Sequence, residues 1–307
     1  MVRSSPAVVI ALLLLLPACG GDDVSNANTG GSGGSAGGSG GSSSGGSAGS
    51  GTGGVAGGGT GGSTSTCAGP KPGPDNTGVP KGVTLTPSGS IKVEQDGAVI
   101  EGLDITGEVT VLADDVTIRN CRITSGDYYP IRYFDNDNVG LLVEDTEIIG
   151  TNGDVTSGIA FANYTARRVN VHGGADGLKA DANVLIEDSW IHDLSNGPGE
   201  HNDCVQSTGG KGVTIRHSTL EGASNAAVQT GDEGAATEDL TIECSWLSGG
   251  GYTLNIRGTG ATVPKNTKII DNRFKDDSAY GPWTIDDPNP TVTGNVWDDT
   301  GAPIPYP

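Results

Sequence analysis

The sequence is poor in the residues that build helical bundles and deep aromatic pockets. It has one Met, three Phe and 5 % aromatic residues among 307. Basic residues are also scarce: 17 Lys and Arg stand against 37 Asp and Glu, which gives a formal net charge of −20. A chain of this charge is unsuited to following the phosphates of DNA or RNA, so we expect no nucleic-acid partner.

Long hydrophobic runs are absent after residue 19, where no apolar stretch approaches the ~18 residues of a membrane-spanning helix. The apolar run over residues 7–16 is also too short to span a bilayer and is typical of an export signal. The sequence LPAC at 16–19 resembles the lipobox of bacterial lipoproteins, although Pro17 replaces the small residue usual there. The resemblance implies that residues 1–19 form a lipoprotein signal whose Cys19 is lipidated. The alternative is an ordinary signal peptide with an incidental cysteine.

Glycine is abundant but unevenly placed. Residues 20–66 contain 21 of the 53 glycines, interleaved with Ser, Ala and Thr. Such a segment has almost no apolar surface to bury, so we expect a disordered linker. The expected arrangement is an exported protein, lipid-anchored at the bacterial cell surface or outer membrane. It would contact the membrane only through the anchor.

The remainder of the chain repeats a six-residue pattern with apolar residues at both ends. Its nine copies start on average 24 residues apart and begin at Ile100, Ile118, Val143, Ala166, Ile186, Ile215, Ile242, Ile269 and Val292. A short β-rich unit with this period is typical of stacked coils, each contacting only its neighbours. The fourth position carries mainly small or polar residues, which we expect to stack as a ladder inside the coils: Leu103, Cys121, Thr146, Val169, Ser189, Ser218, Ser245, Asn272 and Asn295.

This pattern resembles the right-handed parallel β-helix of the pectate-lyase-like superfamily, over residues 90–300. It is also similar to uncharacterised bacterial surface β-helix proteins. We therefore expect an all-β, single-stranded right-handed parallel β-helix of about nine coils over 91–307. The Pro- and Gly-rich segment 67–90 precedes the repeat and is expected to be its N-terminal cap. We expect a monomer.

Four cysteines remain after Cys19, and their spacing does not match a metal site. Cys121 falls in the inward ladder and is expected to be a buried free thiol. Cys67 could pair with a cysteine of the body, but the sequence leaves open whether Cys204 or Cys244 is involved.

Polar side chains gather where a strand follows the repeat motif. The segments 176–180, 203–207, 226–230 and 252–256 align on Leu178, Val205, Val228 and Leu254. This alignment places Asp176 beside Asp203 in one polar column. It places Lys179, Gln206, Gln229 and Asn255 in another.

Enzymes of the resembled superfamily act on glycans laid along the coils, so we expect a polysaccharide partner. The candidate catalytic residues are Asp176, Lys179, His201 and Asp203. The candidate substrate-binding residues, which include part of an aromatic patch at 128–134, are Asn202, Gln206, Gln229, Asn255, Arg132 and Tyr133.

Three functions are open for this cluster. In a lyase acting by β-elimination on a uronic-acid glycan, Lys179 would neutralise the substrate carboxylate and His201 would act as the base. In a glycoside hydrolase, Asp176 and Asp203 would form a carboxylate pair, one of them held protonated by the other. In a glycan-binding or adhesion module, the same side chains would pair with one another. Motifs of known β-helix enzymes are not clearly present.

The lyase is our leading prediction, and we expect Lys179 and His201 to be exposed. Convergence of the four side chains on a groove would favour an enzyme, whereas side chains that pair off on a flat face would favour a binding module.

Metal binding has weaker support in the sequence. The run DNDN at 135–138 offers oxygen ligands for Ca²⁺, but Val139 breaks the EF-hand spacing. His172 and His192 follow their motifs at the same offset, so we expect them to stack one coil apart. A transition-metal site on these two histidines is an alternative.

Overall fold

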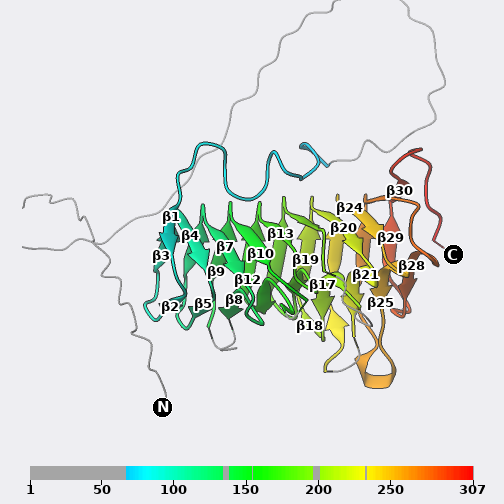
Figure 1. Cartoon of the computed structure of the whole chain (residues 1–307). Coiled ribbons are helices and arrows are strands. Elements are labelled where there is room, and N and C mark those ends of the chain that lie inside the picture. The colour runs from blue at the N-terminus through cyan, green and yellow to red at the C-terminus, as the bar shows by residue number, and fades with distance from the viewer. Residues whose placement is uncertain (1–66, 134–137, 154, 196–200, 232–233, 307) are drawn as a thin grey trace, which may run out of the picture. The chain divides into compact units, whose positions relative to one another are not determined.

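The computed structural model describes residues 67–306 except 134–137, 154, 196–200 and 232–233. In these residues the chain winds into a parallel β-helix whose strands form three long sheets (Figure 1). The elements described are strands and one 3-10 helix, η1 (Gly260–Thr262). The prediction of an all-β parallel β-helix is therefore confirmed. The predicted signal, the linker and Cys19 lie outside the described residues.

Each sheet takes one strand from every coil, and neighbouring strands are parallel. Sheet A has the order β1 (Thr86–Ser88), β4 (Leu103–Thr106), β7 (Arg122–Ser125), β10 (Glu147–Gly150), β13 (Asn170–His172), β16 (Trp190–His192), β20 (Thr219–Ala223), β24 (Trp246–Gly249), β27 (Arg273–Phe274) and β30 (Val296–Trp297). Sheet B has the order β2 (Ile91–Val93), β5 (Val109–Val111), β8 (Ile131–Tyr133), β11 (Ile159–Phe161), β14 (Leu178–Lys179), β17 (Asp203–Ser207), β21 (Ala226–Thr230), β25 (Tyr252–Ile256) and β28 (Gly281–Ile285). Sheet C consists of β3 (Val99–Glu101), β6 (Thr117–Arg119), β9 (Leu141–Glu144), β12 (Tyr164–Arg167), β15 (Val184–Glu187), β19 (Val213–Arg216), β23 (Thr241–Glu243), β26 (Lys268–Ile270) and β29 (Thr291–Thr293). A fourth sheet pairs only β18 (Gly210–Lys211) with β22 (Thr237–Glu238).

The six-residue motif forms the corner between sheets C and A. Its third residue has a left-handed φ between 44° and 71° in all nine copies, at Gly102, Asn120, Asp145, Arg168, Asp188, His217, Cys244, Asp271 and Gly294. Gly, Asn and Asp adopt this conformation at the lowest cost, which explains why they dominate the position. In all copies but the first, the chain turns there from a sheet C strand into a sheet A strand with a single buried residue before the new strand.

That buried residue belongs to the predicted internal ladder, which the structure confirms. Side chains of successive coils accept hydrogen bonds from backbone N–H groups of the coil before. Ser189 N donates to Ser218 Oγ at 3.2 Å, Ser218 N to Ser245 Oγ at 3.1 Å, and Ser245 N to Asn272 Oδ1 at 2.9 Å. The ladder thus satisfies N–H groups that the tight corner would otherwise leave buried without partners.

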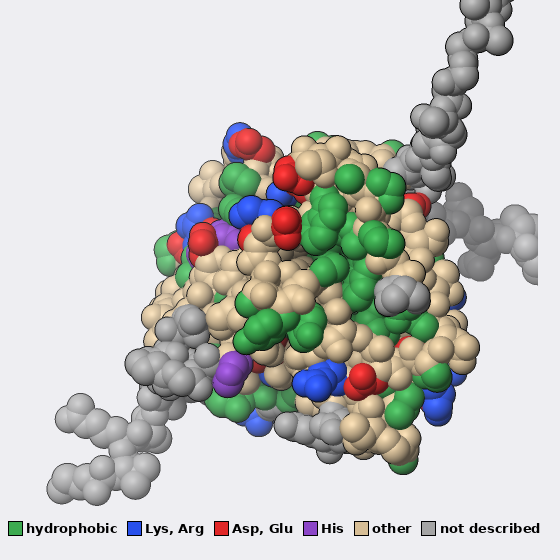
Figure 2. All heavy atoms as spheres, turned by 90° about the vertical axis from the view of Figure 1, so that its right-hand side faces the viewer, with side chains coloured by type: hydrophobic (Ala, Val, Ile, Leu, Met, Phe, Trp, Pro, Cys, Tyr) green, Lys and Arg blue, Asp and Glu red, His purple; other side chains and the backbone are tan. Residues whose placement is uncertain are grey.

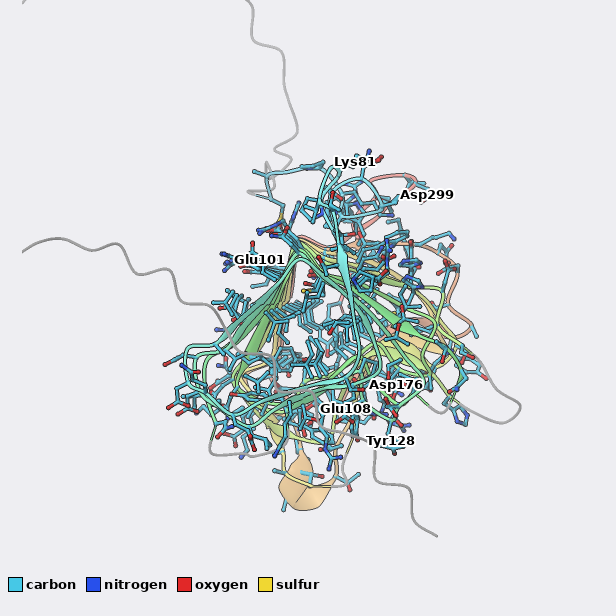
Figure 3. The ribbon with its side chains drawn as sticks, turned by 60° about the vertical axis from the view of Figure 1, so that its left-hand side comes forward. Lys81, Glu101, Glu108, Tyr128, Asp176 and Asp299 are labelled. Atoms are coloured by element: carbon cyan, nitrogen blue, oxygen red, sulfur yellow. A yellow bond between two sulfur atoms is a disulfide. The ribbon has the colours of Figure 1, made fainter. Side chains whose placement is uncertain are left out.

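The interior is filled by aliphatic side chains from all three sheets (Figure 3). The predicted alignment of Leu178, Val205, Val228 and Leu254 is confirmed, because these residues pair in register in sheet B and are all buried. Cys121 is a buried free thiol, as predicted, and Cys204 is another.

Residues 67–85, part of the expected cap, run along the side of sheet A (Figure 1). Cys67 forms a disulfide with Cys244, across 177 residues of sequence. The Pro72 carbonyl accepts a hydrogen bond from Thr219 Oγ1 at 2.8 Å, and Gly78 N donates to the Arg168 carbonyl at 2.8 Å. This side segment crosses several coils before β1 joins sheet A.

Apolar side chains gather at the C-terminal end of the solenoid (Figure 2). Trp283, Trp297 and Ile304 are partly buried there and pack against the core. The last residues fold back on the final strand, because Trp297 N donates to the Ala302 carbonyl and Ile304 N donates to the Asn295 carbonyl, both at 2.9 Å. This end of the hydrophobic core is therefore partly covered by the chain's own terminus.

Candidate functional site

Asp176 and Lys179 lie where the chain enters sheet B, at the edge marked by Asp176 in Figure 3. Lys179 Nζ donates to Asp176 Oδ2 at 2.7 Å and also to Gln206 Oε1 of the next coil. Gly177 stands between them because a Cβ at this position would collide with the Cys204 carbonyl and with Ile191. The close approach of two coils at Gly177 therefore fixes the positions of Asp176 and Lys179.

Asp203 is joined to the same group through backbone and side chain. Its N–H donates to Asp176 Oδ1 at 2.9 Å. Its carboxylate accepts hydrogen bonds from Gln206 Nε2 at 3.2 Å and from Asn225 Nδ2 at 2.9 Å. The two carboxylates and Lys179 therefore form one connected cluster, as the sequence alignment predicted.

The cluster continues as a chain of amides along sheet B. Asn225 Nδ2 also donates to Gln229 Oε1 at 3.3 Å, and Asn255 Nδ2 donates to the same oxygen at 2.6 Å. Gln206, Gln229 and Asn255 pair in register on adjacent strands and are half-buried. Asn225, which the sequence analysis did not single out, is thus the link between the carboxylates and the amide column.

Asp203 is the member of this cluster whose pKa is strongly shifted. Burial, together with the charge of Asp176, raises its pKa from 3.8 to about 7, although hydrogen bonds from Asn225 and Gln206 and the charge of Lys179 act in the opposite direction. A carboxyl group that titrates near neutral pH is a common property of acid–base sites. Structural networks can perturb a pKa in the same way.

The low solvent exposure of the charged side chains favours a structural role for this cluster over a catalytic one. Asp203 is 1 % exposed, and Asp176 and Lys179 are each 6 % exposed. The expectation that Lys179 is exposed is wrong, because its ammonium group is held between Asp176 and Gln206 and has little contact with solvent. The side chains have paired with one another, which was the arrangement expected of a binding module.

His201 and Asn202 lie beside the cluster but differ from each other. His201 is exposed, as predicted. Asn202 is buried, donates from Nδ2 to the Ser195 carbonyl at 3.1 Å and accepts a hydrogen bond from the Ser224 N–H. These hydrogen bonds to the backbone at Ser195 and Ser224 give Asn202 a structural role.

Arg132 and Tyr133 are on β8, and they face opposite sides of sheet B. Arg132 is exposed, whereas Tyr133 is 2 % exposed and belongs to the hydrophobic core. Burial raises the pKa of Tyr133 to about 12. The structure therefore places Tyr133 inside the solenoid, apart from the amide column on the outer face.

The two histidines on sheet A stack one coil apart, as predicted, with ring centroids 5.1 Å apart. His192 Nε2 lies 2.9 Å from Asn170 Oδ1, and its Nδ1 lies 2.8 Å from Asp193 Oδ2. Within the described part of the chain, no group of three or more His, Cys, Asp or Glu side chains is arranged to hold a metal ion. The Ca²⁺ prediction for the DNDN run rests on 135–137, which lie outside the described residues.

Sheet C carries a second polar arrangement, which the sequence analysis missed. One outward column alternates in charge from coil to coil: Glu101, Arg119, Glu144, Arg167, Glu187, Arg216 and Glu243. Arg167 lies 2.6 Å from Glu187 and 3.7 Å from Glu144, and Arg216 contacts the second oxygen of Glu187. We call this column the charge ladder. The sequence does contain its signal, because the ladder occupies the second position of the repeat motif.

A shallow groove of about 730 Å³ lies beside the charge ladder and crosses four coils. Its floor consists of the neighbouring outward column, in which Leu and Thr alternate: Leu142, Thr165, Leu185 and Thr214. Arg167 and Arg216 line one side, and the corner residues Asn163 and Asn183 line the other. Asn183 Nδ2 donates to Asn163 Oδ1 at 2.9 Å. We call this feature the sheet C groove.

The fold and these columns define the chain as a parallel β-helix protein with polar ladders on two outer faces. Comparison with protein-family models, with curated proteins and with solved structures found no match. Among the described residues, no helix has the length and apolar character needed to cross a membrane.

Proposed function

We propose that this protein is a non-catalytic polysaccharide-binding module of the bacterial cell surface, and that the sheet C groove is its binding site. The observation that carries this proposal is the groove itself, which presents a regular series of side chains across four coils. Adjacent coils are ~4.8 Å apart, so an extended polymer lying across them meets a regular series of contacts.

The chemistry of the groove suits a polyhydroxylated ligand. The Arg side chains offer hydrogen-bond donors along one side, and the Asn side chains offer donors and acceptors along the other. Leu142 and Leu185 are half-buried and provide small apolar surfaces on the floor, against which the C–H face of a sugar ring can pack. A nucleic acid is disfavoured by the net charge of −20.

The proposed location follows from the sequence and agrees with the disulfide. Residues 1–19 would direct export, Cys19 would carry the lipid, and residues 20–66 would link it to the solenoid. Disulfides persist mainly in oxidising compartments outside the cytosol, and Cys67–Cys244 is such a bond. Metabolic labelling with a radioactive fatty acid tests the anchor: the wild-type chain should be labelled and Cys19→Ala should not.

Binding can be tested by retention of the full chain on a panel of insoluble and gel-embedded polysaccharides. We expect retention on at least one of them, and loss of retention in Leu185→Asp, which places a charge on the groove floor. Thr241→Asp is the matched control, because Thr241 lies in the same column of sheet C, one coil beyond the groove. No retention on any member of the panel, or equal retention of both variants, would contradict the proposal.

Polysaccharide cleavage at the sheet B cluster is a second candidate, and the raised pKa of Asp203 favours it. In hydrolysis, Asp203 would be the proton donor and Asp176, next to Lys179, the ionised carboxylate. In elimination, His201 would be the base. Incubation with neutral and uronic-acid polymers separates these reactions, because hydrolysis yields reducing ends alone and elimination also yields ultraviolet-absorbing unsaturated ends. Product that disappears in Asp203→Asn would establish an enzyme, and no product would exclude cleavage of these polymers.

A further inference from the structure

The sheet C groove has a chemical repeat of two coils rather than one. The coils that place Leu142 or Leu185 on the floor place a Glu in the charge ladder. The coils that place Thr165 or Thr214 on the floor place an Arg there. The same set of contacts therefore recurs after two coils, or ~9.6 Å.

Charge in the groove is locally compensated. Each Arg of the ladder lies between two Glu residues, and Arg167 and Arg216 both contact Glu187. Burial raises the pKa of Glu187, but hydrogen bonds from Arg216 and Arg167 outweigh this effect, so that its pKa lies below the usual value and the group is ionised at neutral pH. The charged residues that line the groove are Arg167 and Arg216, and both guanidinium groups are already paired with Glu187, which does not line it. The groove is thus complementary to an uncharged polymer.

The linkage of the polymer follows from the repeat. In an extended β-1,4-linked glycan, each ring advances by about the distance between adjacent coils, and successive rings are turned over. The same edge of the chain therefore faces the same direction at every second ring, as the groove requires. An α-1,4-linked glucan curls into a helix and cannot keep this register over four coils.

We propose that the sheet C groove binds an uncharged β-1,4-linked glycan, with one sugar ring on each coil. This inference rests on the proposed function and specifies its ligand. Rings over Leu142 and Leu185 pack on an apolar surface, and the intervening rings lie over the hydroxyl groups of Thr165 and Thr214. The guanidinium groups and the Asn163–Asn183 pair face the ring edges from opposite sides.

The test is isothermal titration calorimetry of the full chain with three hexasaccharides. Cellohexaose is uncharged and β-1,4-linked, maltohexaose is uncharged and α-1,4-linked, and hexagalacturonic acid is anionic. We expect cellohexaose to bind at least about tenfold more tightly than the other two, a difference of ~1.4 kcal/mol. Leu185→Asp and Thr214→Asp should each weaken cellohexaose binding about tenfold or more, whereas the control Thr241→Asp should change it less than about twofold.

The outcomes separate this inference from the proposed function. Leu185-dependent binding of maltohexaose or hexagalacturonic acid at equal or higher affinity would overturn the inference and leave the proposed function standing. If no hexasaccharide binds and no polysaccharide retains the chain, both are wrong. A dimer that light scattering detects in the wild-type chain, and that Leu185→Asp abolishes, would make the groove an interface between copies and would also overturn the inference.

Discussion

The carboxyl group of Asp203 couples protonation to stability. Its pKa is about 7 in the folded protein and close to 3.8 when unfolded, so the folded state holds its proton more tightly. The resulting stabilisation is complete below about pH 4 and is lost as the pH rises through about 7. A cluster that serves catalysis and one that serves only structure would both show this dependence, so it tests the electrostatics alone.

We expect the wild-type chain to lose up to about 4 kcal/mol of unfolding free energy between pH 4 and pH 8 from this group. Asp203→Asn cannot ionise and should remove most of that loss. The measurement is chemical denaturation across this pH range. Asp239→Asn is a suitable control, because Asp239 is hydrogen-bonded to Asn266 and Lys211 and its pKa is lowered. If the pH dependence of Asp203→Asn matched that of the wild type, Asp203 would not be the group responsible.

Sequence alternation predicts the neighbours of a residue on sheet B but not its burial. The columns on sheet B were predicted in the correct register, because the two-residue period of a strand fixes which side chains are neighbours. The burial of Asp176 and Lys179 was not predicted. This burial depends on the hydrogen bonds of Lys179 to two neighbours and on the packing of Gly177 against the next coil. Neither can be inferred from the alternation of inward and outward side chains along a strand.

In sheet C, the alternating charges of the charge ladder influence how neighbouring coils stack. A shift of one coil would place Glu beside Glu, so the charge ladder favours the native stacking order over a shifted one. The ladder is therefore a source of specificity as well as a side of the groove. Because most members, unlike the buried Glu187, are half-buried or exposed, a single pair among them contributes little.

Arg167→Glu would place three carboxylates in succession, at 144, 167 and 187. We expect it to lower the unfolding free energy by about 1–3 kcal/mol, and Arg167→Gln to have a smaller effect, because only the former adds repulsion. The difference between the two variants should shrink in high salt, which screens exposed charges. Equal destabilisation by both variants, independent of salt, would show that Arg167 acts through packing and not through charge.

Elements differed in how far they could be predicted. The inward ladder was predicted, since it occupies one position of the six-residue motif, whereas the corner between sheets C and A that the same motif forms was not. The charge ladder occupies the second position of the same motif and was not predicted. The path of residues 67–85 could not be inferred, because its contacts with Thr219 and Arg168 are formed by residues far apart in the sequence.

At the scale of the whole molecule, the solenoid gains stability from contacts between neighbouring coils. The side segment 67–85 is an exception, because it contacts several coils at once and is closed by a disulfide. Cys67–Cys244 therefore fastens the N-terminal end of the side segment to a coil far from β1. Its loss should affect the stack as a whole rather than one coil.

We expect Cys67→Ser to lower the unfolding free energy by about 2–5 kcal/mol. The side segment should also open, because only hydrogen bonds and packing would then hold its N-terminal part. Limited trypsin digestion can detect this opening as faster cleavage after Lys81, which is exposed. Cys121→Ala is a control for loss of a cysteine, since Cys121 is a free thiol. Unchanged stability and digestion in Cys67→Ser would show that the segment is held without the disulfide.

The disulfide also determines where mechanical load enters the protein. A pull on the chain before Cys67 reaches the corner at Cys244, well inside the stack, before it reaches the first coil. Stacked coils detach easily when peeled one at a time from an end, but they resist a load applied sideways to many inter-strand hydrogen bonds. A load applied before Cys67 would therefore leave the N-terminal coils, and the groove across them, intact.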